Sequence, residues 1–166
     1  MIRVALALLL ALAAGPAPAV EFKASTPTPM VFAVRDRDGG VHAGAELRAR
    51  ITLVHFWATW CLPCREELPA LKSLQDDMRG AGVRVAAISI DRLGWGAIDR
   101  TIAALDVGGL AIYHDLDREA AKALRVETLP TTILMDADGQ EIARLNGQGD
   151  WRDPALRRAI LARAGK

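Results

Sequence analysis

The segment HFWATWCLPCREELP, residues 55–69, constrains this chain more than any other, because it contains both of its cysteines. Cys61 and Cys64 are separated by two residues, so a disulfide between them closes a very small loop. Structural disulfides stabilise a fold best when they close long loops, and this bridge would add little stability. The spacing therefore favours redox chemistry over a structural crosslink.

The two cysteines lie where a predicted strand meets a predicted helix. Residues 51–59 (ITLVHFWAT) are apolar and include β-branched and aromatic side chains, as expected of a central strand buried on both faces. Beyond the cysteines, Leu68, Leu71 and Leu74 have helical spacing, and the glycines of residues 80–82 mark the end of that helix. The sequence therefore predicts a strand that leads directly into a redox helix.

The rest of the chain alternates predicted strands and helices. An N-terminal hairpin is predicted around Asp38-Gly39-Gly40. The elements after the redox helix are strand VRVAAISID, helix GAIDRTIAALDV, strand LAIYHD, helix DREAAKALRV, the strand-turn-strand unit PTTILMDADGQEIARLNG, and a final helix that Asp153 and Pro154 cap. Because a strand-helix-strand unit pairs its strands in parallel through a right-handed crossover, we expect an α/β fold with one central mixed β-sheet flanked by helices.

Residues 1–19 have the pattern of a signal peptide. Arg3 precedes an apolar run too short to span a bilayer comfortably, and Ala17-Pro18-Ala19 is a small-x-small cleavage pattern. We expect cleavage before Val20 and export; the alternative is an uncleaved segment that anchors the chain in a membrane. Residues 20–30 are rich in proline and threonine and are predicted to be a linker, which leaves residues 31–166 as the folded domain.

Charge and ligand counts exclude several classes of partner. The chain has 21 basic and 20 acidic residues, and this balance argues against nucleic acid or an anionic membrane surface as the main partner. A zinc site needs four ligands, and the chain has no second cysteine pair. His42, His55 and His114 keep a metal site open as an alternative by count alone, but we expect no metal and no cofactor.

Several motifs resemble those of one known family. The run FWATWCLPC is similar to the active-site run of the thioredoxin superfamily, and LPTTILMDADG resembles its cis-proline loop. The combination of ATWC, Glu67 and GQGDW resembles the TlpA/ResA branch of exported thiol-disulfide oxidoreductases, many of which are linked to cytochrome c maturation or oxidase assembly. LAIYHDLDREAAKAL stands where that branch inserts a β-α unit. The resemblance covers roughly residues 31–164 and implies a thioredoxin-like fold.

The resemblance also implies a function. It indicates a periplasmic thiol-disulfide oxidoreductase that reduces protein disulfides and is itself reduced by a membrane electron donor of the thiol-reductase type; we expect a monomer. A copper chaperone on the same fold is the alternative, although Sco-type chaperones use C-x-x-x-C with a distant histidine and the spacing here is one residue shorter. A peroxidase of the superfamily is a third option, although its P-x-x-x-T-x-x-C run is missing.

The predicted helix start assigns different roles to the two cysteines. Unpaired backbone N–H groups and the helix dipole favour a thiolate at a helix N-terminus. Cys61, nearer the exposed end, is the predicted nucleophile, and Cys64 is the predicted buried thiol that resolves the mixed disulfide. Between them, Pro63 sets φ near the helical value and removes one N–H group.

Pro63 and three further residues are predicted to line the substrate site. Trp60 precedes Cys61 and is expected on the surface beside it. By resemblance, Pro130 follows a cis peptide bond, and Leu129 presents its backbone beside the cysteines, where a substrate strand can pair with it. An ordinary trans proline that opens a strand is the alternative.

Two ionisable residues complete the predicted site. Glu67 lies about one helical turn beyond Cys64, and the resemblance implies a partly buried carboxyl group that helps move protons; a solvated side chain like that of Glu66 is the alternative. His55 lies where thioredoxin has a buried aspartate and the TlpA branch often has asparagine. A neutral imidazole can accept the Cys64 proton and return it, whereas a packed, hydrogen-bonded core histidine is the other interpretation.

Overall fold

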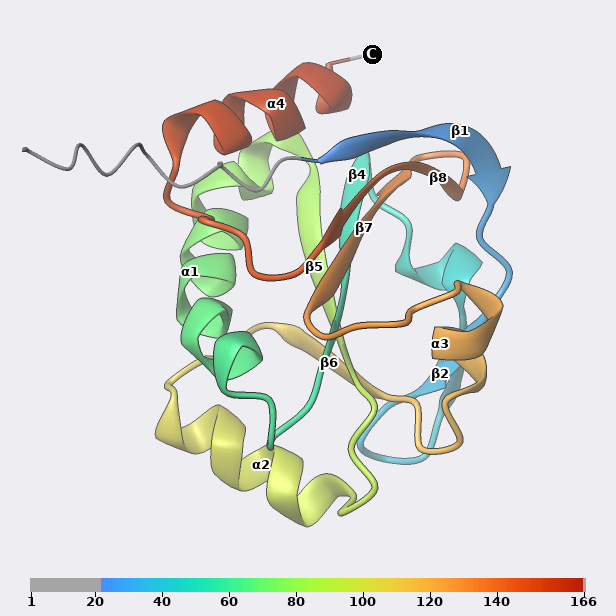
Figure 1. Ribbon diagram of the computed structural model, residues 1–166, viewed down its shortest axis with the longest axis vertical. Helices are drawn as coiled ribbons and strands as arrows, with labels where there is room; N and C mark the ends of the chain where they lie inside the picture. The colour runs from blue at the N-terminus through green and yellow to red at the C-terminus, as the bar shows by residue number, and fades with distance from the viewer. Residues whose placement is uncertain (1–21, 166) are drawn as a thin grey trace, which may run out of the picture.

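One mixed sheet of eight strands, in the order β1-β8-β7-β4-β5-β6-β2-β3, runs through the molecule (Figure 1). It is seen in a computed structural model that describes residues 22–165. The strands are β1 (Lys23–Pro29), β2 (Ala33–Arg35), β3 (Val41–Ala43), β4 (Ile51–Trp57), β5 (Val83–Ser89), β6 (Ala111–His114), β7 (Thr131–Asp136) and β8 (Gln140–Asn146). The expected α/β fold with a central mixed sheet is confirmed.

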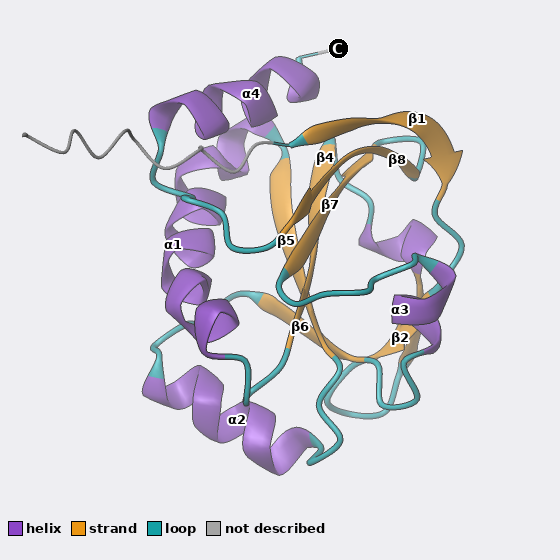
Figure 2. Ribbon diagram, viewed as in Figure 1, coloured by secondary structure: helices purple, strands orange, loops and turns teal. Residues whose placement is uncertain are grey.

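Within residues 22–165, four α-helices pack around this sheet. They are α1 (Leu62–Met78), α2 (Trp95–Ala104), α3 (Glu119–Ala123) and α4 (Pro154–Ala164), with 3₁₀ turns at Gly44–Leu47 and Arg79–Ala81. Figure 2 shows α1 and α4 to one side of the strands and α3 to the other. The predicted leucine stripe of α1 (Leu68, Leu71 and Leu74) is fully buried, and it packs the helix into the core.

The centre of the sheet follows from the strand-helix-strand order. β4 pairs in parallel with β5, β5 in parallel with β6, and β4 antiparallel with β7. Every residue of β4 is buried, which confirms the predicted central strand. Since β4 ends at Trp57 and α1 begins at Leu62, the cysteines lie at the carboxyl edge of the parallel strands, where α/β folds commonly place their sites.

The predicted hairpin and the inserted β-α unit are both present. β2 and β3 pair antiparallel across a turn in which Asp36 N–H donates to the Gly40 carbonyl at 2.9 Å, and Gly39 adopts a φ of 87°. The hairpin joins the sheet where Arg35 pairs with His114 of β6. The inserted unit consists of β6 and the short helix α3.

The prediction of a linker at residues 20–30 is wrong for most of that segment, because Lys23–Pro29 forms the strand β1. This strand pairs antiparallel with β8, from Lys23 opposite Arg144 to Pro29 opposite Gln140. Its side chains are nearly all exposed, so it has no apolar alternation by which to recognise it. β1 is also an edge strand, where proline is tolerated because one side of the backbone needs no partner.

The predicted signal peptide, residues 1–19, and its predicted cleavage site before Val20 lie outside the described residues. Among the helices that the structure describes, none combines the length and apolar character needed to cross a bilayer.

Candidate active site

Both cysteines lie at the N-terminus of α1 and form a disulfide with an S–S distance of 2.06 Å. Cys61 is the N-cap residue, and its Sγ accepts a hydrogen bond from the Cys64 backbone N–H at 3.3 Å. Its own N–H donates to the Ala58 carbonyl at 3.1 Å and closes the turn between β4 and α1. Cys61 is 7% exposed and Cys64 is 0% exposed, so Cys61 is the one that a partner can reach.

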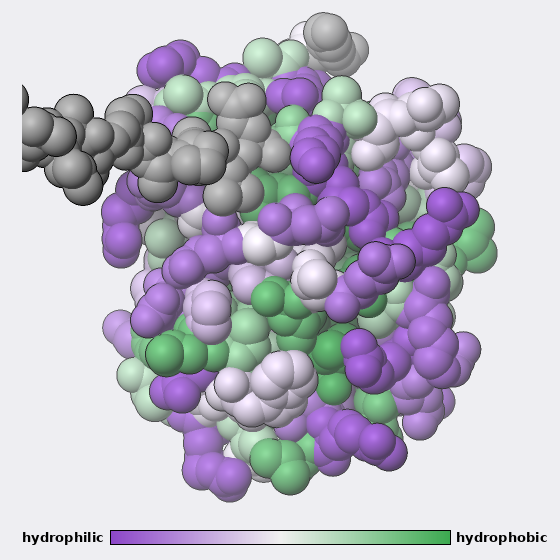
Figure 3. Space-filling model, in the orientation of Figure 1, coloured by the Kyte–Doolittle hydropathy of each residue, from purple (hydrophilic) through white to green (hydrophobic). Residues whose placement is uncertain are grey.

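A groove of about 360 Å³ lies beside the disulfide. Its lining includes three of the residues predicted to contact substrate, Trp60, Pro63 and Leu129. The exposed fraction is 67% for Trp60 and 60% for Leu62, so apolar surface borders Cys61. Figure 3 shows hydrophobic atoms gathered near the middle of this face, in the region that Figure 1 places between α1 and α3.

The Leu129–Pro130 peptide bond is cis, as the resemblance implied. Pro130 itself is buried and does not line the groove; its carbonyl accepts a hydrogen bond from Gly147 N–H at 2.8 Å. Leu129 is only partly buried and faces the groove. The structure thus brings Leu129 and Cys61 to the same groove, whereas Pro130, which was also predicted to contact substrate, is buried and outside its lining.

Glu67 is not a solvated helix glutamate, since it is 3% exposed whereas its neighbour Glu66 is exposed. One carboxyl oxygen, Oε2, accepts hydrogen bonds from Gly149 N–H and from Trp151 Nε1–H, each at 2.9 Å. Burial raises the pKa of Glu67 to about 7, against the lowering effect of these two bonds. The carboxyl group can therefore gain or lose a proton near neutral pH.

The GQGDW segment is the source of both donors to Glu67. A Cβ atom at Gly149 would lie 2.9 Å from the Trp151 ring, so only glycine lets the backbone come this close. Trp151 is 1% exposed and packs against Phe22, with ring centroids 6.1 Å apart. The buried indole directs its Nε1–H at Glu67 Oε2.

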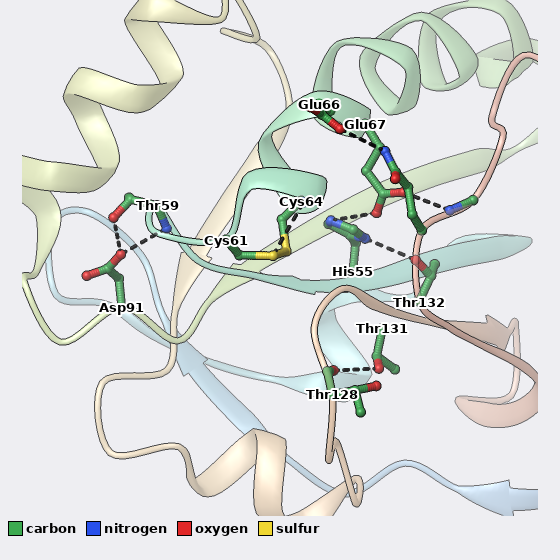
Figure 4. The surroundings of a disulfide bond; sticks show 12 residues. His55, Thr59, Cys61, Cys64, Glu66, Glu67, Asp91, Thr128, Thr131 and Thr132 are labelled. Carbon is green, nitrogen blue, oxygen red and sulfur yellow. Dashed lines mark hydrogen bonds and ion pairs between the residues drawn. A yellow bond between two sulfur atoms is a disulfide. The ribbon is translucent and has the colours of Figure 1, made fainter.

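His55 lies inside β4, and its imidazole is fully buried. Nδ1 is 3.0 Å from Thr132 Oγ1 on β7, and Nε2 is 3.5 Å from Glu67 Oε1 (Figure 4). Burial lowers the pKa of His55 to about 3, so the ring is neutral at physiological pH. Within the described residues, Nε2 and Oε1 have no other hydrogen-bond partner.

The 3.5 Å separation of His55 and Glu67 would suit an ion pair, but the burial of both groups argues against two charges. Burial favours the neutral form of each group, so below pH 7 the proton resides on Glu67. Glu67 can then donate toward Nε2 while Nδ1–H donates to Thr132. Once Glu67 ionises, the other tautomer lets Nε2–H donate to Oε1 and Nδ1 accept from the Thr132 hydroxyl.

Sequence reasoning missed Asp91, Thr59 and Thr132. Asp91 follows the buried strand β5, is 0% exposed, and accepts a hydrogen bond from Thr59 N–H at 2.9 Å. A charged residue at the carboxyl end of a buried strand beside a redox turn is the one sequence signal that pointed to Asp91. Thr132 has no comparable signal, because a threonine in a strand is ordinary.

The other two histidines contact aspartate residues. His42 Nε2 lies 2.7 Å from Asp36 Oδ2 in the hairpin, and His114 Nε2 donates to the Asp91 carbonyl at 2.7 Å. Across residues 22–165, no three His, Cys, Asp or Glu side chains converge in a way that could hold a metal ion.

Comparison with known sequences identifies a family. The profile of the AhpC/TSA family matches residues 17–142, more than half of the 166-residue chain. The thiol-disulfide oxidoreductase ResA of Bacillus thuringiensis subsp. konkukian (strain 97-27) is 28% identical over 117 residues, which cover 70% of this chain and 66% of that protein. ResA of Bacillus subtilis (strain 168) is 26% identical over 116 residues, or 64% of its length. The chain thus spans slightly less than two thirds of these relatives.

Comparison with solved structures identifies proteins whose fold is similar to that of this chain. A thiol:disulfide interchange protein DsbE from Chlorobium tepidum superposes with a TM-score of 0.72 at 23% identity, covering 89% of this chain and 99% of that one. StoA from Bacillus subtilis superposes with a TM-score of 0.64 at 23% identity, covering 79% and 96% respectively. These likenesses show a shared fold.

Proposed function

The chain belongs to the AhpC/TSA family and is a thioredoxin-like protein of the TlpA/ResA type, and on this premise we propose that it is a thiol-disulfide oxidoreductase acting through Cys61 and Cys64. The observation that carries the proposal is the disulfide at the N-terminus of α1, with Cys61 at the edge of a groove and Cys64 buried behind it. This asymmetry suits a nucleophile that meets the substrate and a resolving thiol that does not.

The proposed reaction transfers two electrons from the reduced dithiol to a protein disulfide. The Cys61 thiolate attacks one substrate sulfur, forming a mixed disulfide and releasing the other substrate sulfur, which takes up a proton. Cys64 then loses its proton and attacks Cys61 Sγ, which breaks the mixed disulfide and releases the second substrate thiol. The products are the Cys61–Cys64 disulfide and two substrate thiols.

The second step needs a group that accepts the proton of Cys64, and Glu67 with His55 suits this task. Glu67 lies one helical turn from Cys64 on the buried face of α1. Its pKa of about 7 allows it to accept a proton and later release it at neutral pH. His55 Nε2 faces Oε1 and has no other partner among the described residues, so His55 can share that proton by changing tautomer. We assign both residues to proton transfer on these grounds.

The proposed direction of electron flow is reduction of substrate. The imidazole of His55 is neutral and so does not stabilise a thiolate, and the apolar side chains of Leu62 and Leu129 disfavour a charged sulfur beside them. A thiolate that is poorly stabilised favours the disulfide form, and so makes the dithiol a better reductant. We therefore expect a reduction potential below that of the glutathione couple.

The proposed setting is the periplasm, with a membrane dithiol donor that restores the reduced form. The predicted signal peptide at residues 1–19 motivates export, and intact-mass analysis of exported protein should give a chain that begins at Val20. The TlpA/ResA likeness favours substrates of cytochrome c maturation or oxidase assembly. A full-length mass with membrane retention would indicate an anchor instead.

Trapping tests the proposed function. In Cys64→Ala, the mixed disulfide on Cys61 cannot be resolved, so substrate proteins should remain covalently attached and be released by dithiothreitol. Cys61→Ala is the matched control and should trap nothing. Equilibration of the wild type with glutathione tests direction: a pair largely reduced at roughly −200 mV, a poise typical of an oxidising compartment, would identify an oxidant and overturn the reductase proposal.

A further inference from the structure

The carboxyl group of Asp91 lies on the other side of the active-site turn from Glu67, and its contacts go to the turn itself (Figure 4). We infer that Asp91 is a positioning residue: through Thr59 it holds the turn that carries Cys61, and so governs the reactivity of that thiol. The inference deepens the proposed function and rests on it for its biological meaning. Asp91 acts through Thr59 and not by direct contact with the sulfur atoms.

Three donors converge on the Asp91 carboxylate. Oδ2 accepts from Thr59 N–H at 2.9 Å and from the Thr59 hydroxyl, while Oδ1 accepts from Leu93 N–H at 2.9 Å. Burial alone raises the pKa of Asp91, but the hydrogen bonds from Thr59 and Leu93 outweigh that effect and hold it below its usual value. Asp91 is therefore a fixed negative charge with both oxygens engaged.

The backbone of Asp91 is itself anchored. Its N–H donates to Ser89 Oγ at 3.2 Å, and its carbonyl accepts from His114 Nε2–H at 2.7 Å. His114 is 6% exposed and lies edge-on to Trp95, with ring centroids 5.8 Å apart. The carboxylate is thus tied to β5 and β6, and can serve as a rigid support for the turn beside it.

The held turn leads directly to Cys61. Thr59 is two residues before Cys61, and the next residue, Trp60, is 67% exposed and therefore has little packing of its own. The position of Cys61 Sγ relative to the first N–H groups of α1, such as that of Cys64 at 3.3 Å, determines how well those groups stabilise a thiolate. Releasing Thr59 from Asp91 should let the turn move and weaken that stabilisation.

A double-mutant cycle with Thr59→Val and Asp91→Asn tests the inference. Thr59→Val removes the hydroxyl at nearly constant volume and leaves the charge of Asp91 in place. We expect iodoacetamide to alkylate Cys61 of the reduced, folded variant about threefold more slowly at pH 7, the size expected for loss of one hydrogen bond. Thr59→Ser, which keeps the hydroxyl, should restore the wild-type rate.

The double-mutant cycle can be read whether the loss of the Asp91 charge speeds or slows the alkylation of Cys61. If Asp91 acts through Thr59, the effect of Asp91→Asn on the alkylation rate should differ by about threefold or more between the wild-type and Thr59→Val backgrounds. Thr101→Val, which removes a helix hydroxyl bonded to the Ala97 carbonyl, is the matched control and should leave the rate unchanged. Additive effects, or a lower unfolding midpoint with unchanged alkylation, would overturn the inference.

The alkylation assay needs no redox partner, so the two proposals can fail separately. If wild-type protein does not exchange disulfides with glutathione or proteins, the proposed function fails. If it exchanges normally but the cycle is additive, Asp91 is only a structural residue and the proposed function stands.

Discussion

Glu67 on α1 and Asp91 at the end of β5 are both buried carboxyl groups, with exposed fractions of 3% and 0%, and they flank the same redox turn. The pKa of Glu67 is raised to about 7, whereas that of Asp91 is lowered. Burial pushes both pKa values upward, so the sign of the burial effect does not distinguish the two groups, and the hydrogen bonds that oppose burial have to be compared.

The hydrogen bonds to the two carboxyl groups differ in which oxygens they reach. Both donors to Glu67 reach Oε2, and Oε1 faces a histidine nitrogen that can give or accept a proton. Asp91 instead receives fixed donors on both oxygens, from Thr59 and Leu93. A carboxyl group with one oxygen left to a neutral imidazole can exchange a proton, while one fully engaged by N–H and O–H donors remains a permanent charge. On one side of the turn, Glu67 can therefore exchange a proton; on the other side, Asp91 remains charged and holds the turn in place.

The largest expected effect comes from removing the exchangeable proton. Glu67→Gln retains the shape of the side chain but cannot accept a proton from Cys64, so resolution of the mixed disulfide should slow by about 100-fold. In wild type this rate should rise with pH through about 7, as Glu67 ionises, and the variant should lose that inflection. Stopped-flow measurement of substrate-thiol release from pH 5 to 9 gives both quantities.

Glu66→Gln is the control for this prediction, because Glu66 is the exposed neighbour on the same helix. It should behave as wild type. An inflection near pH 7 that survives in Glu67→Gln would show that another group accepts the proton, and the contrast with Asp91 would lose its functional meaning.

A smaller effect is expected on the pH dependence of stability in His55→Asn. His55 has a folded pKa of about 3 against 6.5 in the unfolded chain, so as pH falls between these values only the unfolded state takes up a proton, and stability is lost. The pKa of Glu67 is about 7 in the folded protein against 4.5 in the unfolded chain, so its effect has the opposite sign. The contribution of Glu67 to the free energy of unfolding falls as pH rises between these two values. The two contributions cancel between about pH 4.5 and 6.5.

His55→Asn should remove the histidine contribution and leave that of Glu67. The free energy of unfolding of wild type minus that of the variant should increase by about 1.4 kcal/mol for each pH unit from 4.5 to 6.5. Urea unfolding of the disulfide forms at a series of pH values measures it. Glu67→Gln should give a difference of opposite slope, and parallel curves for all three proteins would mean that neither group has a perturbed pKa.

The smallest expected effect tests whether donors set the pKa of Glu67. Trp151→Phe removes one of its two hydrogen-bond donors, so the charged form loses stabilisation and the pKa should rise above 7 by up to about one pH unit. NMR titration of the Glu67 carboxyl carbon measures the value directly. Phe22→Leu, which alters packing against the same indole, should leave it unchanged; an equal rise in both variants would point to packing instead.

Local patterns in the sequence were enough to predict much of the fold. The apolar run of β4, the leucine spacing of α1, the glycine turn of the hairpin and the Asp153 cap of α4 each reflect interactions among neighbouring residues, and each was found as expected. The same local reading placed Cys61 at the start of α1 and Glu67 one turn beyond Cys64. β1 was missed because an exposed edge strand carries no apolar period.

The sequence by itself therefore determined the dithiol, the helix that carries it and the order of strands and helices from the β2–β3 hairpin onward. Only the tertiary structure decided what surrounds the dithiol, since Thr59 meets Asp91 across 32 residues, His55 meets Thr132 across 77, and Glu67 meets Trp151 across 84. Whether a carboxyl group becomes a proton exchanger or a fixed charge depends on such distant donors and on burial, because both change the relative free energy of its charged and neutral forms. Residue type and spacing along the chain do not contain that information.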